Sequence, residues 1–291
     1  MGVSRTARIP RPAPGYSSWT SVSGCAYRKV DLPSDLLRMK PRRYLRTSDL
    51  ARAVGAHSNT VRLYEEWGFL PPVPRSPSGY RQFTEAHLEQ MRLARLALHG
   101  GWPGRNIRQS ALALVRQAAS GDLGSALELA YHHLALVKAE RIQAEAAADY
   151  LEHWAQGTPT DTTAGPLRIG DAARRLGLTV DILRSWERNG LTDVPRDPHS
   201  GYRLYGAPGI GRLRVVRMLL RSGYSTMAVL RMLLVLDHGQ ETNLRRVLDT
   251  PRPDEDVYSA ADRWLSTLDE QEQRARQLVT QLKKMTRMHK K

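Results

Sequence analysis

The 291-residue chain has few of the features that mark secreted or membrane proteins. Its single cysteine, Cys25, excludes an intramolecular disulfide framework and any zinc site built on several cysteines. No apolar run reaches the roughly 18 residues that a transmembrane helix needs. No apolar segment follows the arginines near the N-terminus, as a signal peptide would require. We therefore expect a protein of the reducing cytoplasm with no membrane partner.

Catalytic and metal-binding patterns are missing as well. The chain has no G-x-S-x-G elbow, no Walker loop and no H-E-x-x-H motif, so we expect no enzyme activity. His132, His133 and His153 fall in one helical segment, but adjacent histidines face different sides of a helix and position 153 is too distant. The sequence thus predicts no metal site and no cofactor.

Acidic residues are in deficit, with 29 Asp and Glu against 44 Lys and Arg and a formal net charge of +15. Such a charge favours nucleic acid or an acidic membrane surface as partner, the alternative being a basic surface unrelated to function. Residues 1–43 hold nine Lys or Arg, two Asp and several prolines without periodicity, which predicts a disordered tail. This tail is either an arm that contacts DNA phosphates, a spacer, or the product of a misassigned start before Met39.

The most prominent feature of the chain is an internal repeat. The tetrapeptide S-G-Y-R occurs at 78–81 and again at 200–203. Residues 45–108 align with 167–230 without a gap, and 17 of the 64 positions are identical. This period is far longer than that of a solenoid repeat, so the pattern indicates one module present twice.

Each copy predicts a helix-turn-helix followed by a β-hairpin. Apolar periodicity predicts a helix over Ser48–Val54 and a second one from Ser58, which end at Gly55 and Gly68 because glycine readily takes positive φ. A proline-rich stretch and S-G-Y-R then indicate a small hairpin, called the wing below. Further helices are expected near 84–98 and 104–117, with counterparts near 208–221 and 225–236.

A long helix is expected at the end of each copy. Apolar residues follow coiled-coil spacing over 127–151 and 257–285, and only Arg141 and Gln271 interrupt these two seams. The segment 157–166 between the halves is a polar Pro/Gly linker that can reach about 33 Å. If the two seams pair with each other, one chain forms both halves of a dimer.

The sequence therefore predicts a mainly α fold. It has two winged helix-turn-helix domains, each followed by a long coiled-coil helix, in a pseudo-two-fold arrangement. The predicted domains are a tail at 1–43, a first winged helix-turn-helix at 44–120, a first coiled-coil helix at 121–156, a linker at 157–166, a second winged helix-turn-helix at 167–250 and a second coiled-coil helix at 251–291.

Four stretches carry a family resemblance. R-L-Y-E-E-W-G-F-L-P-P (62–72) with S-G-Y-R-Q-F (78–83), and R-S-W-E-R-N-G-L (184–191) with S-G-Y-R-L-Y (200–205), resemble the MerR family of transcription regulators. The resemblance covers residues 44–291. The family usually has two aromatic residues after the helix arginine, whereas Leu63 and Ser185 replace the first of them here. The second, Tyr64 or Trp186, either contacts DNA or packs in the core.

The resemblance implies a bacterial, cytoplasmic and nucleoid-associated regulator that binds double-stranded promoter DNA. It implies that the protein distorts the promoter spacer so that RNA polymerase holoenzyme engages both promoter elements. Family members work as homodimers whose long helices pair antiparallel. A monomeric pseudo-dimer is the favoured interpretation for this chain, and a homodimer with four modules is the alternative.

The expected DNA contacts lie on the second helix of each copy and on its wing. Recognition helices place their N-terminal residues at base edges. Asn59 in the first copy can read adenine and Asp181 in the second can accept from cytosine, so the two copies should read different bases. Arg62 and Arg184 are expected at phosphates, the alternative being an ion pair with Glu65 or Glu187 three residues further on. The full expected set is His57, Ser58, Asn59, Thr60, Arg62, Tyr64, Arg75, Tyr80, Arg81, Thr179, Asp181, Arg184, Trp186, Arg196, Tyr202 and Arg203.

Two other functions remain open at this stage. Aromatic residues in or near the helical regions either line a pocket for a small-molecule effector or form core. These residues are Trp102, Tyr131, Tyr150, Trp154, Tyr224, Tyr258 and Trp264. A pocket without DNA binding would make the protein a drug-sequestering one. Broad, shape-driven DNA binding would instead make it an architectural, excisionase-like bending protein.

Overall fold

The computed structural model describes residues 44–98, 104–162, 165–239, 243–251 and 260–289. The expected tail at 1–43 lies outside these ranges, as do Trp102, Val257 and Tyr258. Helices make up most of the described residues and no strand occurs among them, which confirms the mainly α prediction. None of these helices is long and apolar enough to cross a bilayer.

The first module folds as its apolar periodicity predicts. Its helices are α1 (Thr47–Ala53), α2 (Ser58–Glu66), α3 (Glu85–Leu98) and α4 (Arg105–Ala119). Gly55 between α1 and α2 has a φ of 61°, a conformation that favours glycine. Leu50, Val61 and Phe83 are fully buried in one cluster with α3, so the helix pair and the base of the wing share a single core.

The second module repeats this order and adds one helix. Its helices are α6 (Ile169–Leu176), α7 (Val180–Arg188), α8 (Ala207–Arg221), α9 (Thr226–Asp237) and α10 (Leu244–Asp249). The sequence pattern did not indicate α10, because six residues are too few to show a helical period. The Asn243 side chain accepts the N–H of Arg246 at 2.9 Å at its start. At its end, buried Arg231 donates to the Val247 carbonyl oxygen at 2.7 Å.

The wings are shorter than the predicted β-hairpins and differ between the modules. Each is closed by one antiparallel bridge, Arg75 with Arg81 and Arg196 with Arg203. The inner turn runs from Ser76 to Tyr80 in the first wing and over 197–202 in the second. The second turn is therefore one residue longer, and the gapless alignment is wrong over this segment. Arg196, not the residue after it, is the structural counterpart of Arg75.

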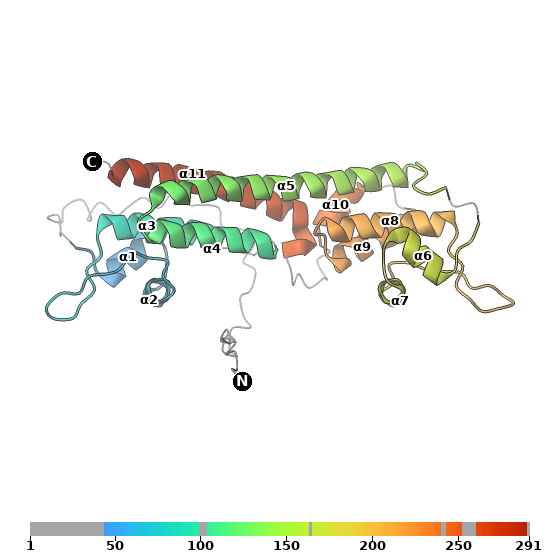
Figure 1. Ribbon diagram of the computed structural model, residues 1–291, viewed down its shortest axis with the longest axis horizontal. Coiled ribbons are helices and arrows are strands. Elements are labelled where there is room, and N and C mark those ends of the chain that lie inside the picture. Colours follow the sequence, from blue (N-terminus) through green and yellow to red (C-terminus); the bar gives the residue numbers. More distant parts are fainter. Residues whose placement is uncertain (1–43, 99–103, 163–164, 240–242, 252–259, 290–291) are drawn as a thin grey trace, which may run out of the picture. The chain divides into compact units, whose positions relative to one another are not determined.

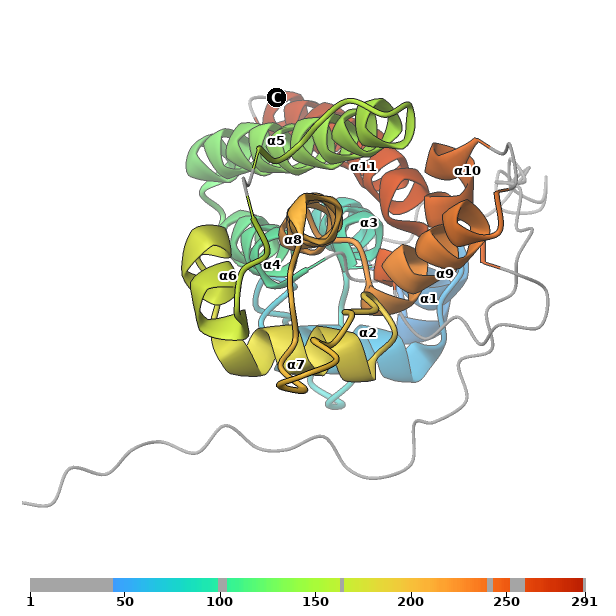
Figure 2. The same cartoon turned by 90° about the vertical axis from the view of Figure 1, so that its right-hand side faces the viewer.

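Two long helices, α5 (Leu123–Ala155) and α11 (Trp264–His289), follow the modules and pack side by side (Figures 1 and 2). They run antiparallel, because Ala126 and Ala130 near the start of α5 share a cluster with Leu282 near the end of α11. The polar interruption at Arg141 also has a partner: its Nε lies 2.9 Å from Glu272 Oε2. The predicted seams therefore pair with each other within the chain.

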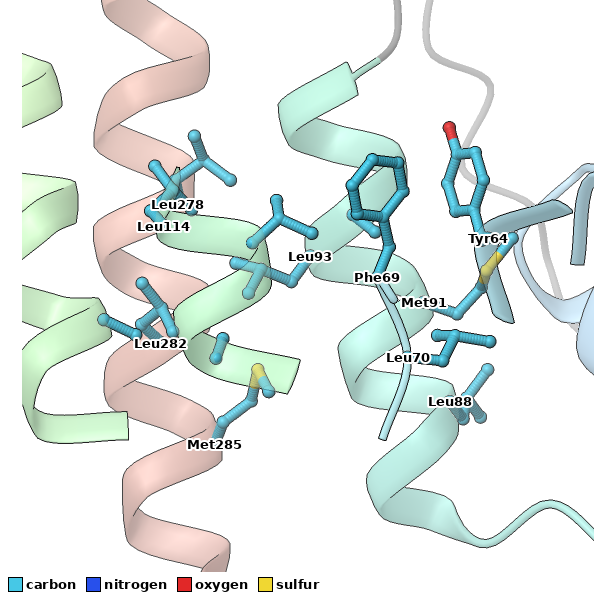
Figure 3. Close-up of a cluster of buried hydrophobic side chains, with 14 of the residues drawn as sticks. Tyr64, Phe69, Leu70, Leu88, Met91, Leu93, Leu114, Leu278, Leu282 and Met285 are labelled. Atoms are coloured by element: carbon cyan, nitrogen blue, oxygen red, sulfur yellow. The ribbon is translucent and has the colours of Figure 1, made fainter. Parts of the chain in front are cut away.

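Each long helix packs on the module that it does not follow in sequence. The end of α11 lies on α3, where Leu278, Leu282 and Met285 belong to one buried cluster with Leu93 and Leu114 (Figure 3). The end of α5 lies on α8, since fully buried Leu151 belongs to the cluster of the second module. The exchange ties the two modules together through apolar contacts.

The middle of the linker is held on the second module by one buried carboxylate. The Asp161 side chain is fully buried, with Oδ2 2.6 Å from Arg214 NH2 of α8 and 3.2 Å from Arg175 Nε of α6. A buried carboxylate needs such partners because desolvation otherwise disfavours its charge. The linker thus packs on the second module at Asp161.

Candidate nucleic-acid interface

The helix-turn-helix of each module has an exposed second helix that carries the predicted recognition residues. In Figures 1 and 2, α2 and α7 lie on the side of their modules away from α5 and α11. Buried Val61 in α2 and buried Leu183 in α7 fix these helices on their cores. The opposite face of each helix is left to solvent, as a surface that enters a DNA groove must be.

The first recognition helix is capped by His57, one of the residues predicted to contact DNA. His57 is the N-cap residue, and its Nδ1 accepts the N–H of Asn59 at 3.2 Å. The Asn59 side chain remains exposed at the second helical position, whereas Ser58 and Thr60 are half-buried. Asn59 is therefore the best placed of these four to reach a base edge, and His57 has a capping role.

The second recognition helix is capped by the hydroxyl of Thr179. Its Oγ1 accepts the N–H of Ile182 at 3.3 Å. The Asp181 side chain is 90% exposed and lies 3.4 Å from the NH1 of Arg184. Thr179 and Asp181 thus match His57 and Asn59 in position, with a carboxylate in place of an amide.

A glutamate in each recognition helix holds the wing, a role that the sequence reasoning missed. Arg81 Nε donates to Glu65 Oε2 at 2.5 Å, and Arg75 NH2 donates to Glu65 Oε1 at 3.1 Å. Arg203 Nε donates to Glu187 Oε2 at the same 2.5 Å in the second module. The signal was present, because both members of each Glu–Arg pair are identical in the two copies.

These pairs correct two sequence expectations. Glu65 and Glu187 pair with wing arginines and not with Arg62 or Arg184, so the alternative of an i,i+3 pair with those glutamates is wrong. Arg62 is exposed and has no side-chain partner in the described part of the chain, which leaves it available for a phosphate. Arg184 pairs with Asp181.

Three predicted wing contacts serve the fold of the wing. Arg81 and Arg203 are only 23% and 27% exposed because their guanidinium groups face the glutamates. Arg196 NH1 donates to the Gly201 carbonyl oxygen at 3.2 Å across the turn. The hydrogen bond from Arg203 to Glu187 also raises the pKa of Arg203, so this arginine stays charged. Their first effect is to hold the wing against the recognition helix.

The tips of the wings present aromatic rings to solvent. Tyr80 is 74% exposed and Tyr202 is 57% exposed. Gly79 and Gly201, with φ of 81° and 70°, make the turns that project these rings. In the second wing the Arg168 guanidinium lies 4.9 Å from the Tyr202 ring centroid. Both tyrosines are therefore exposed at the wing tips, and Arg168 lies beside one of them.

The two recognition-helix aromatics differ in how far they are buried. Tyr64 is 7% exposed and meets the Phe69 ring edge to face, with centroids 5.5 Å apart. Burial raises the pKa of the Tyr64 hydroxyl. Trp186 is half-buried against both clusters of the second module. The assignment of Tyr64 as a DNA contact is therefore corrected to packing, whereas Trp186 as a DNA contact stays a prediction.

Two of the helical aromatics, Trp264 and Tyr224, fill the core of the second module. Buried Trp264 donates from Nε1 to the Ser222 carbonyl oxygen at 2.6 Å, and the Tyr224 hydroxyl donates to the Ala144 carbonyl oxygen at 3.1 Å. Tyr131 is exposed on α5. No cluster of metal-binding side chains occurs over the described ranges.

One histidine that the sequence singled out is buried. His133 is 2% exposed, and its Nδ1 lies 2.6 Å from Ser110 Oγ. Because that hydroxyl donates to the Ile107 carbonyl oxygen, it accepts from His133 Nδ1–H. Burial, together with the neighbouring charge of His132, lowers the pKa of His133 to about 4. His133 is therefore a neutral core residue that links α4 to α5.

Comparison with known proteins finds the same module in both halves of the chain. The family model described as "MerR HTH family regulatory protein" matches residues 45–113 and 167–234. HTH-type transcriptional regulator CueR of Escherichia coli O157:H7 is 42% identical over 55 residues, which cover 19% of this chain and 41% of CueR. The chain thus spans less than half the length of that relative.

Two further relatives match. A probable heavy metal-dependent transcriptional regulator of Haemophilus influenzae is 28% identical over 107 residues, 37% of this chain and 82% of that protein. A mercuric resistance operon regulatory protein of Serratia marcescens is 36% identical over 73 residues, 25% of this chain and 50% of the relative. No solved structure gives a significant match.

Proposed function

The chain belongs to the MerR family and carries two of its helix-turn-helix modules in tandem, and from this premise we propose that it is a sequence-specific regulator of transcription that binds double-stranded promoter DNA. The exposed recognition helix and the projecting wing in each module support this function. The net charge of +15 suits a polyanionic partner. The family is a regulatory one, which agrees with the absence of catalytic motifs in the sequence.

The single chain acts as a pseudo-dimer. The supporting observation is the intramolecular pairing of α5 with α11, in which each helix ends on the opposite module. Gln281 of α11 donates to Glu89 Oε2 of α3 at 2.7 Å, and Lys284 donates to the same oxygen at 2.8 Å. A second copy of the chain is not required to bury the apolar side of either long helix.

The DNA contacts follow from exposure and charge. Asn59 and Asp181 read bases, and Arg62 and Arg184 bind phosphates one turn further along their helices. Tyr80, Tyr202 and Arg75 approach the DNA from the wings, which Glu65 and Glu187 hold against the recognition helices through Arg81 and Arg203.

Binding of both modules to one promoter distorts the spacer between promoter elements and so controls initiation by RNA polymerase holoenzyme. Such a deformation costs several kcal/mol, which the contacts of two modules offset. The protein then works in the cytoplasm on the nucleoid, with or without a small-molecule effector. Domain limits remain those of the sequence prediction, with Asp161 of the linker packed on the second module.

Selection of duplexes from a random pool by the full-length chain tests this proposal. We expect two different half-sites at a fixed separation, together with the sedimentation mass of one chain at low micromolar concentration. A perfect palindrome bound by a two-chain species would refute the pseudo-dimer and favour a homodimer. Broad enrichment set by DNA shape alone would indicate an architectural bending protein. No enrichment would refute DNA binding and favour a ligand-sequestering protein.

A further inference from the structure

The two recognition helices present different chemistry at the same helical position. Asn59 and Asp181 each stand at the second residue of their helix, two positions after the N-cap residues His57 and Thr179. Both side chains are exposed. The same place in the same element therefore carries an amide in one module and a carboxylate in the other.

The Asp181 carboxylate is accessible to a ligand. Its side chain is 90% exposed, and its ion pair with Arg184, itself 53% exposed, has a nitrogen–oxygen distance of 3.4 Å. An ion pair this long and this exposed contributes little to stability. Asp181 can therefore leave Arg184 when a better hydrogen-bond donor comes within reach.

Only hydrogen-bond donors in a DNA groove can bind a carboxylate. Phosphates repel it, so Asp181 needs a base donor, and the major groove offers the amino groups of cytosine N4 and adenine N6. The acceptor N7 lies beside N6 on adenine and repels the second carboxylate oxygen. Cytosine has no acceptor beside N4 on its groove edge. Cytosine is therefore the base that a carboxylate at this position selects.

The surroundings of Asp181 agree with that choice. Ile182 is 38% exposed and Val180 is half-buried, where the first module has the polar Thr60 and Ser58. This apolar surface suits the carbon edge of a pyrimidine. Arg184 supplies a positive charge one turn away, which offsets the repulsion between Asp181 and nearby phosphates.

We propose that Asp181 determines sequence specificity by accepting a hydrogen bond from cytosine N4 in one half-site. Asn59 selects adenine at the corresponding position of the other half-site, through its paired donor and acceptor. The proposal rests on the DNA-binding function above. It identifies the chemistry that makes the binding site asymmetric.

Reciprocal substitution tests the assignment. Duplexes are selected by the full-length wild type, by Asp181→Asn and by Asn59→Asp, and the affinities are then measured with each base at the affected pair. The wild type should prefer cytosine there by about tenfold or more. Asp181→Asn should change that preference to adenine and leave the first half-site unchanged. Asn59→Asp should change the first half-site from adenine to cytosine.

The outcomes separate this proposal from the function on which it rests. If Asp181→Asn keeps the cytosine preference, or weakens binding equally on every sequence, Asp181 does not read a base. If the wild type itself selects no sequence, DNA binding fails and this assignment fails with it. A thermal unfolding curve of each variant that matches the wild type, as expected for exposed side chains, shows that the changes in preference do not arise from misfolding.

Discussion

Removal of the Leu282 side chain should destabilise the first module, although Leu282 lies near the other end of the sequence. Leu282 is fully buried in the cluster that α11 shares with α3 and α5, which also holds Leu114 and Ala130; Figure 3 shows Leu282 and Leu114 in this cluster. Leu→Ala at a buried site costs about 2.7–5 kcal/mol, and the cost is greater where the neighbours cannot move into the cavity. Alanine neighbours on α5 have no flexible side chain to fill it. We therefore expect a loss of about 3–4 kcal/mol for Leu282→Ala.

Urea denaturation of Leu282→Ala and of the wild type measures this loss, and Arg287→Ala on an exposed position of α11 is the matched control. The control should change stability by less than about 0.5 kcal/mol. Hydrogen exchange should increase in α3 and α4 before it increases in α8. A loss below about 1 kcal/mol, or faster exchange confined to α8, would show that α11 does not pack on the first module.

Three further results are expected. Arg62→Ala should weaken binding on all DNA sequences alike and lower the salt dependence by about one ion; an unchanged salt slope in a binding titration would show that Arg62 reaches no phosphate. Glu89→Gln should cost about 2 kcal/mol at neutral pH. Burial tends to raise the pKa of Glu89, but hydrogen bonds from Lys284 and Gln281 prevail and lower it. The stabilisation is therefore present above pH 4.5 and is lost as the pH falls through the lowered pKa, so the stability difference between wild type and variant in acid unfolding curves should shrink there. His133 should destabilise the fold as the pH falls from 6.5 to about 4, because the unfolded chain takes up the proton first; His133→Gln should flatten the stability–pH curve over that range, and an equally steep curve would assign the effect to other groups.

The elements that the sequence predicted well are those set by neighbouring residues. Helices α1 and α2 begin and end within a residue or two of the expected positions, because apolar spacing and Gly55 act over a single turn. The apolar seams of α5 and α11 also followed from local periodicity, although periodicity alone did not decide whether they pair within one chain or between two.

What the sequence did not predict depends on contacts between distant residues. Glu65 and Arg81 are 16 positions apart, so helical spacing offered Arg62 as the alternative partner of Glu65 and could not indicate Arg81. Nothing in the sequence indicated that Asp161 pairs with Arg175 and Arg214, because these arginines lie 14 and 53 positions further along the chain. Tyr64 could be assigned to DNA because an aromatic residue on a short helix serves either surface or core, and only the fold decides.

The exchange of long helices has a consequence for synthesis on the ribosome. Gln281 bonds to Glu89, a residue made 192 positions earlier. At about 5–20 residues per second, the first module emerges about 10–40 s before the helix that completes its core. During that interval Leu93 and Leu114 lack their partners from α11, so a nascent or truncated chain exposes apolar surface and is prone to aggregate. Because both modules lie in one chain, the core of the first module is complete only after α11, near the end of the chain, has been synthesised.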